Sequence, residues 1–388
     1  MQFSTSIQPN IDKNQSWWER FSSQPHQLFF TSTLFFAIFI MVLTLCILDG
    51  IVNLDFGLIH GFGFNYALFT NAFLGFLITV IPKYNGSIAI NKDKYLTPWI
   101  VYQISIFITF FINITLGKIL ISIVLLYFVK IFYDTIKNGK AVIKTESIQI
   151  NFILFLGAIL LFIEAILSKN LSILISFSFL ISMVFLIAIK MVPAFYFAYT
   201  RITPWQRPKY INILSIILII LTGISIQFEL NILLKIVSFI SSIFFGYVLM
   251  KLNLFKKTPA ILSILVLGLV WFEIAFISLY IESNFLNYTF KLSFHIFAVG
   301  FMTTLLIGFG SRVIKGHAIP AQNIQADKIT KYLFVFTQIV LIARILTSIS
   351  FIAQSMFFTY ILNISAIFWI ILFVIWGFKY GKTLLRIN

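Results

Sequence analysis

Residues 211–250 read INILSIILIILTGISIQFELNILLKIVSFISSIFFGYVLM, two apolar runs that meet at a short polar break around Glu229. Each run, 211–228 and 232–250, has nearly the length of about 20 apolar residues that an α-helix needs to cross a bilayer. Similar runs precede and follow this pair along nearly the whole chain. The pattern predicts an all-α polytopic membrane protein with about twelve transmembrane helices.

The composition supports the same fold class. Of the 388 residues, 60% are hydrophobic and only 10% are charged, whereas a soluble domain carries about 25% charged residues. These values exclude a soluble globular protein and a disordered chain. We predict a polar tail at 1–27, one helical membrane domain at 28–378 and a second tail at 379–388. The expected helices cover 28–48, 60–82, 97–116, 118–136, 148–167, 171–192, 211–228, 232–250, 260–280, 289–311, 330–351 and 358–378.

The distribution of basic residues predicts the orientation of these helices. Of 28 lysines and arginines, 20 fall in the two tails and the even-numbered connections, whereas Lys118 and Lys169 fall in the odd-numbered ones. Lys and Arg collect in cytoplasmic loops, so both termini should be cytoplasmic. Because the net charge of +16 sorts by side, we do not expect a nucleic-acid partner. The 20 residues are Lys13, Arg20, Lys83, Lys92, Lys94, Lys137, Lys140, Lys144, Arg201, Arg207, Lys209, Lys251, Lys256, Lys257, Arg312, Lys315, Lys328, Lys379, Lys382 and Arg386.

The four histidines separate into two pairs under this topology. His60 opens the second predicted helix and His295 lies in the tenth, both near the outer face, whereas His26 and His317 lie near the inner face. The 22 residues from His295 to His317 span about 33 Å as a helix, so these two cannot share one metal centre. Four histidines are also too few for the six-histidine centre of a haem–copper oxidase or a respiratory nitric oxide reductase.

Three other ionisable residues are expected in the outer half of the membrane: Glu164, Glu273 and Arg344. A charge in the hydrocarbon costs at least about 2.5–3.5 kcal/mol on insertion scales and usually faces a partner or a cavity. Similar depth therefore predicts one outward-facing polar cavity with His60 and His295. The alternative is separate snorkelling at the helix ends.

Small residues recur beside His60. Gly63, Ala67, Asn71 and Gly75 form one face of the second predicted helix. This stripe favours close helix–helix packing, although beside a histidine it could instead leave room for a flat porphyrin. The single cysteine, Cys46, cannot form the Cys-x-x-Cys-His attachment of c-type haem. Any haem here would therefore be b-type.

Three segments resemble the NnrS family of haem-containing bacterial membrane proteins. His60–Pro82 is similar to the family's histidine-rich opening and its Gly-Phe-Leu-x-Thr-x-x-Pro helix end. Val192–Thr200 is similar to its (Ile/Val)-Pro-Phe-Phe-Thr stretch. The block from His295 to Gly300, continued by Arg312 and Gly316-His317, resembles His-x-x-x-Val-Gly followed by Arg-x-x-x-Gly-His.

The resemblance implies a function and a set of site residues. Family members are described as containing haem and copper and as acting in the response to nitric oxide. By resemblance, we expect one or two b-type haems, with His60, His295, His26, His317 and Arg312 as candidate cofactor-binding residues. His60 and His295 are the candidate iron ligands.

The sequence gives less reason to expect copper than haem. The family shows His-x-His-Glu-Met at the second helix, whereas this chain has Phe62 and Gly63-Phe64 at the positions after His60. His and Met are natural copper ligands, and this chain lacks them there.

We accordingly expect a multi-pass protein of the bacterial inner membrane that binds or turns over nitric oxide or a related nitrogen oxide. As an enzyme it would be a haem-dependent nitric oxide oxidoreductase supplied by an unidentified electron donor, with Glu273, Arg344 and Glu164 as candidate catalytic residues. The alternatives are a secondary transporter that couples through its intramembrane Glu and Arg, and a membrane subunit of a respiratory complex.

Overall fold

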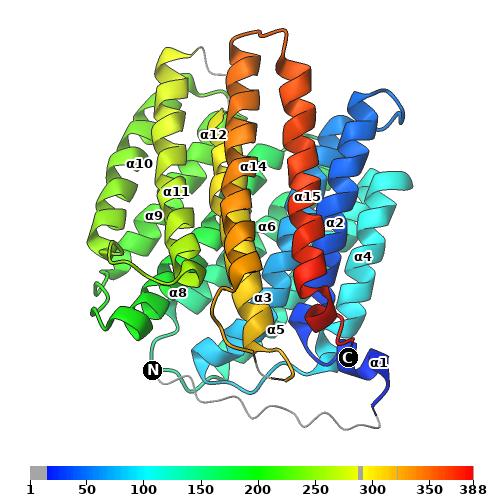
Figure 1. The fold of residues 1–388 in the computed structure, drawn as a ribbon, viewed down its shortest axis with the longest axis vertical. Coiled ribbons are helices and arrows are strands. Elements are labelled where there is room, and N and C mark those ends of the chain that lie inside the picture. Colours follow the sequence, from blue (N-terminus) through cyan, green and yellow to red (C-terminus); the bar gives the residue numbers. More distant parts are fainter. Residues whose placement is uncertain (1–14, 287–291, 321, 388) are drawn as a thin grey trace.

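The computed structural model describes residues 15–286, 292–320 and 322–387, and within them every regular element is helical. Long helices stand side by side as one bundle (Figure 1). Eleven of them are long and apolar enough to cross a membrane. The described residues thus confirm an all-helical, multi-spanning protein. The first 14 residues of the predicted tail, and the start of the predicted helix at 289, lie outside the described residues.

The long helices follow the predicted order, with shifted ends. The first helix begins at Pro25, so it contains His26, which the sequence had placed before it. The eleven candidate spans are α2 (Pro25–Leu48), η1–α3 (Gly57–Asn85), α5 (Ile114–Lys137), α6 (Thr145–Leu167), α7–η3–α8 (Ser172–Thr200), α9 (Lys209–Gln227), α10 (Asn231–Leu252), α11 (Ala260–Phe285), α12–η4–α13 (Leu292–Gly316), α14 (Lys328–Ile352) and α15 (Phe358–Leu384).

The remaining long helix is α4 (Leu96–Phe111), whose 16 residues are fewer than the others have. It packs against α5 and η1. Two short elements accompany the long helices: α1 (Trp17–Phe21) and a 3₁₀ turn, η2 (Lys92–Lys94).

Three spans form the interior of the bundle. In their most apolar stretches, η1–α3 is 83% buried, η3–α8 is 89% buried and η4–α13 is 72% buried, whereas no other candidate span exceeds 56%. Each also contains a π-helical segment: η1 (Gly57–Thr70), η3 (Ser176–Ile181) and η4 (Ile296–Thr303). These are the second, sixth and tenth long helices. A buried span with a π-helical segment therefore occurs at every fourth long helix.

Hydroxyl groups follow the wider π register. In the α-helical parts, Thr33 and Thr79 donate to the carbonyl four residues back. At the ends of the π segments, Thr70, Thr303 and Ser182, which directly follows η3, instead donate to the carbonyl five residues back, at 2.7–2.9 Å. Because π segments frequently occur at functional sites, they direct attention to the far ends of the three buried spans.

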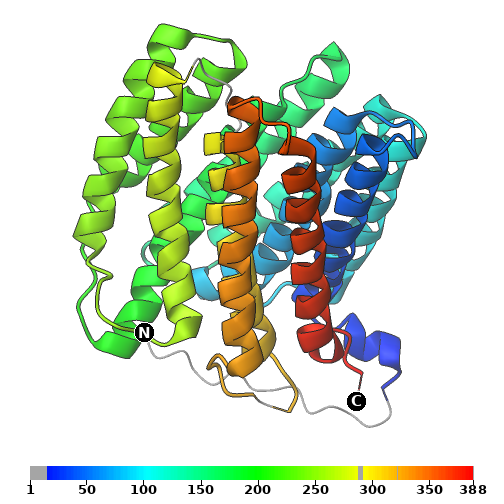
Figure 2. The same ribbon diagram turned by 45° about the horizontal axis from the view of Figure 1, so that its top comes forward.

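The first described helix, α1, and the end of α15 lie at one end of the bundle (Figures 1 and 2). Trp17 Nε1 donates to the Leu385 carbonyl at 2.8 Å and ties α1 to the end of α15. The even-numbered connections reach this end because the long helices alternate in direction. We call it the basic end, since the described residues among the basic ones counted above lie there, and we call the opposite end the far end.

The small-residue stripe on η1–α3 packs against α2. A Cβ on Gly63 would lie 3.2 Å from Ile40, and one on Gly75 would lie 2.7 Å from the Cβ of Phe29. Ala67 is fully buried, and Asn71 exchanges side-chain hydrogen bonds with Gln103 of α4. The stripe is thus a helix-packing surface, and the alternative of room for a porphyrin along it is wrong at both glycines.

Candidate functional site

Histidines of two buried spans meet an arginine at the far end. Arg344 of α14 donates from Nη2 to His295 Nε2 at 2.8 Å. His60, one turn inside η1, lies within electrostatic range of the same guanidinium. Helices far apart in the sequence thus bring Arg344 into contact with His295, with His60 at the same end of the bundle. We call His60, His295 and Arg344 the far-end cluster.

Aromatic rings fix the orientation of His60. Its imidazole stacks on Phe56, with ring centroids 5.1 Å apart and planes 10° apart, and meets the edge of Phe64 at 4.9 Å. Its Nδ1 is buried and has no hydrogen-bond partner. An unpaired buried polar nitrogen costs about 1–3 kcal/mol. This nitrogen therefore marks an imidazole that can gain energy from a ligand.

No ion pair to Arg344 occurs among the described residues. Besides His295, its guanidinium reaches the Ser348 hydroxyl at 3.4 Å. A charge half-buried among apolar helices requires compensation, and the neighbouring imidazole supplies little. The far-end cluster is consequently a place where an anionic group would be stabilised.

The two predicted catalytic glutamates lie elsewhere. Glu164 forms a close ion pair with Lys118 between α5 and α6, and its other oxygen accepts from the Leu171 backbone at 2.9 Å. Glu273 of α11 faces α10, where its carboxylate lies 3.2 Å from the position that a Cβ on Gly246 would take. The structure therefore does not gather Glu164, Glu273 and Arg344 into one cavity.

The inner histidines are in contact with each other at the basic end. The rings of His26 and His317 have centroids 4.9 Å apart. His317 Nδ1 donates to the Val313 carbonyl at 3.0 Å, and its Nε2 accepts from Lys83 Nζ at 3.1 Å. Burial, followed by the nearby charge of Lys83, lowers the pKa of His317. Such contact leaves no space for a porphyrin between the two rings.

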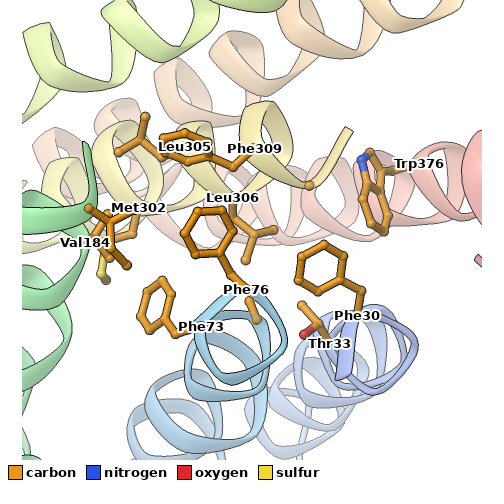
Figure 3. Close-up of a pocket in the computed structure, with 13 residues that line it drawn as sticks. Phe30, Thr33, Phe73, Phe76, Val184, Met302, Leu305, Leu306, Phe309 and Trp376 are labelled. Carbon is orange, nitrogen blue, oxygen red and sulfur yellow. The ribbon is translucent and has the colours of Figure 1, made fainter. Parts of the chain in front are cut away.

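A small apolar cavity lies between the two histidine pairs. Its volume is about 40 Å³, and about 10–15 Å³ suffices for one water. Figure 3 shows side chains from α2, α3, α8, η4, α13 and α15 pointing into it. Its one hydroxyl, from Thr33, is already bonded to the Phe29 carbonyl. A dry cavity of this size suits a small apolar molecule. The lining comprises Phe30, Thr33, Ala72, Phe73, Phe76, Val184, Ile187, Met302, Leu305, Leu306, Phe309, Gly310 and Trp376.

The three segments that carry the family resemblance also meet near the basic end. The Arg312 guanidinium stacks on Phe195 at 4.0 Å from the ring centroid. Phe309 lies 5.6 Å from Phe76 and 6.5 Å from Phe195. The NnrS protein family matches residues 20–387. The chain belongs to the NnrS family. No curated protein matches it.

In this NnrS chain the far-end cluster fits a haem by its donor chemistry. Haem iron is commonly held by imidazole nitrogen, and His60 offers a buried nitrogen without a partner. Arg344 offers a guanidinium suited to carboxylates. A free imidazole nitrogen for the iron and a guanidinium for a carboxylate are the two groups that a haem would use here.

Sequence reasoning missed the partners of the predicted residues. Lys118 was counted as a loop residue, yet it pairs with Glu164. Lys83 and Arg386 were counted only as topology signals, yet both contact His317. Lys83 follows Pro82 and His317 follows Gly316, so the sequence placed both residues at helix ends on the same side of the membrane. Hydropathy does not indicate which helices are neighbours, so it could not show that the two residues are in contact.

Proposed function

We propose that this NnrS protein is an integral membrane protein of the bacterial inner membrane that holds b-type haem and binds nitric oxide or a related small nitrogen oxide near its outer face. The observation that carries the proposal is the contact of Arg344 with His295 at the far end, where His60 also offers a buried nitrogen without a partner. Family membership supports the same reading, because the resemblance implies a haem protein of the nitric oxide response.

Within this proposal the two histidines have different roles. His60 would ligate the iron, because its Nδ1 has no competing partner. His295 would line the distal side, because Arg344 already donates to its Nε2. The bound haem would supply an iron with an open coordination position for nitric oxide. Arg344 would hold an anionic group, such as a propionate or nitrite, by charge-assisted hydrogen bonds.

We propose one haem, at the far end. His26 and His317 touch each other and would not flank a porphyrin together. Turnover of nitric oxide would require electrons from a donor and protons. Glu273 retains a buried, unpartnered Oε2 and is the better placed of the two glutamates to exchange a proton, since Glu164 is already paired with Lys118.

Titration with nitric oxide tests the binding role. The dithionite-reduced, purified protein should show a saturable shift of its Soret band on addition of nitric oxide, and carbon monoxide should shift it differently. The His295→Ala protein should bind nitric oxide with altered affinity, because the distal donor is gone. A reduced spectrum that nitric oxide leaves unchanged contradicts the proposal.

We also propose twelve spans, with α4 as the twelfth and both termini in the cytoplasm. The support is the sorting of basic residues to the basic end, which the positive-inside rule assigns to the cytoplasm. Reporters fused after Asp55 and after Lys140 should report the outside and the inside, respectively. If both fusions report the same side, the assignment of the far end to the outer face is wrong.

A secondary transporter is the second candidate, and the buried Glu273 favours it. An intramembrane carboxyl is expensive and often serves in proton coupling. The two candidates differ in colour, because a purified transporter is colourless whereas a haem protein is red.

A further inference from the structure

Basic side chains gather around His317 at the basic end, with no acidic partner among the described residues. Lys83 Nζ donates to His317 Nε2 at 3.1 Å, and Arg386 Nη2 donates to the His317 carbonyl at 3.1 Å. His26 lies against the His317 ring. Electrostatic coupling links His26 to all three. We call Lys83, His317, Arg386 and His26 the basic-end cluster.

Two nitrogens of the cluster are buried without a hydrogen-bond partner. They are Nη1 of Arg386 and Nδ1 of His26. Both residues are well over nine-tenths buried, with 7% and 3% of their surface exposed. An unsatisfied donor on a charged group costs more than the about 1–3 kcal/mol of a neutral one. Ordinary surface lysines and arginines avoid this cost, so topology alone does not explain the arrangement.

Asp327, a carboxylate at the N-cap of α14, is engaged by other cations. Asp327 forms ion pairs with Lys379 at 2.7 Å and with Lys315 at 3.2 Å. Burial alone would raise the pKa of this carboxyl, but hydrogen bonds from Lys379, Thr330 and Lys315 lower it well below its usual range. Asp327 is therefore ionised and committed to other cations.

The ends of α3 and α13 offset only part of this charge. Each helix C-terminus carries about half a negative charge and stabilises a nearby cation by about 0.3–1 kcal/mol. Lys83, and Arg386 through its bond to the His317 carbonyl, benefit from it. Such a dipole leaves Arg386 Nη1 without an acceptor, since only Nη2 reaches the His317 carbonyl. The cluster consequently needs an anion with several acceptor oxygens.

We propose that the basic-end cluster binds a phosphate group, supplied by the headgroup of an acidic membrane lipid or by a free phosphate. A phosphate presents several acceptor oxygens and pairs with the planar arginine fork and with the lysine ammonium. Basic pockets between helices on the cytoplasmic side are suited to lipid headgroups. Lys83 is exposed and gives the ligand its way in. This site is separate from the far-end cluster and does not depend on haem.

The test uses the full-length protein and two probes. In the lipid arm, native mass spectrometry counts the phosphatidylglycerol molecules retained after purification, with phosphatidylcholine as the neutral probe. In the phosphate arm, inorganic phosphate is titrated against thermal unfolding in detergent. The protein should retain phosphatidylglycerol but not phosphatidylcholine if a lipid supplies the group. It should be stabilised by inorganic phosphate, and not by equal chloride, if the free ion does.

Three variants decide the location. Arg386→Gln and Lys83→Gln should lower retention or phosphate affinity at least fivefold. Lys382→Gln removes an equal charge from an exposed position in the last turn of α15 and should have no effect. Lys83→Gln keeps the test sound if Arg386→Gln fails to fold, because Lys83 is exposed. Equal losses in all three variants, or binding of neither probe by the unaltered protein, would overturn the proposal. Loss of haem without loss of either probe in Arg386→Gln would also overturn it, since haem carboxylates would then be the occupant.

Discussion

His60→Ala protein is expected to purify with about a tenth or less of the haem that the unaltered protein carries. The physical reason is that His60 offers the buried nitrogen without a partner, and removal of an iron ligand should cost at least the 10–100-fold in affinity that loss of an outer-shell partner costs. His295→Ala should instead retain haem but show a changed ferrous–NO spectrum, because His295 is held by Arg344. Haem content and optical spectra of both proteins check this.

A histidine at the other end provides the matched control. His26→Ala removes a buried imidazole from the basic end and should leave haem content unchanged. Native haem content and spectra in both His60→Ala and His295→Ala would contradict the assignment. Haem loss in both would favour two axial histidines over a proximal and a distal one.

The second large effect is expected at Glu164. Replacing it by alanine strands the Lys118 ammonium, whose side chain is 13% exposed and lies over the Phe62 ring. Breaking a buried pair by removing one partner costs about 3–5 kcal/mol. We expect a loss of about 3 kcal/mol, because Lys118 is not fully buried. The loss should appear as an unfolding temperature lower by several degrees.

Two further variants distinguish a structural role of Glu164 from a catalytic one. The double replacement of Lys118 and Glu164 by leucine should recover most of the stability, because no charge is left unpaired. Glu146→Ala, which breaks more exposed pairs with Lys190 and Arg207, should cost at most about 1 kcal/mol. If Glu164→Ala is as stable as the unaltered protein but loses nitric oxide turnover, Glu164 is a catalytic residue and the structural reading is wrong.

The helical fold was predictable because hydropathy and charge depend on the sequence alone and not on which helices are neighbours. Apolar runs located each long helix, and the sorting of lysines and arginines placed the tails at the same end. Helix ends were less predictable: α2 begins three residues earlier than expected and takes in His26. The π segments could not be predicted from hydropathy or charge. They depend on how η1, η3 and η4 pack inside the bundle, and an apolar sequence such as Ile296–Thr303 fits either register.

The candidate site was predictable in depth but not in direction around each helix. Depth grouped His60 and His295 with Arg344, and His295 does contact Arg344. It also grouped Glu164 and Glu273 with them, although the first faces α5 and the second faces α10. A residue's azimuth depends on which helices are neighbours, and sequence hydropathy does not contain that information. Family resemblance marked the histidines but not Lys83 or Arg386, which are their partners.

Haem content tests the central claim most directly. A pyridine haemochrome assay, combined with iron and copper analysis of the purified full-length protein, measures the type and number of haems per chain. The proposal predicts a red protein with a b-type haemochrome and about one iron per chain. A colourless, folded protein that contains no iron and takes up no added haem would contradict the proposal and favour the transporter.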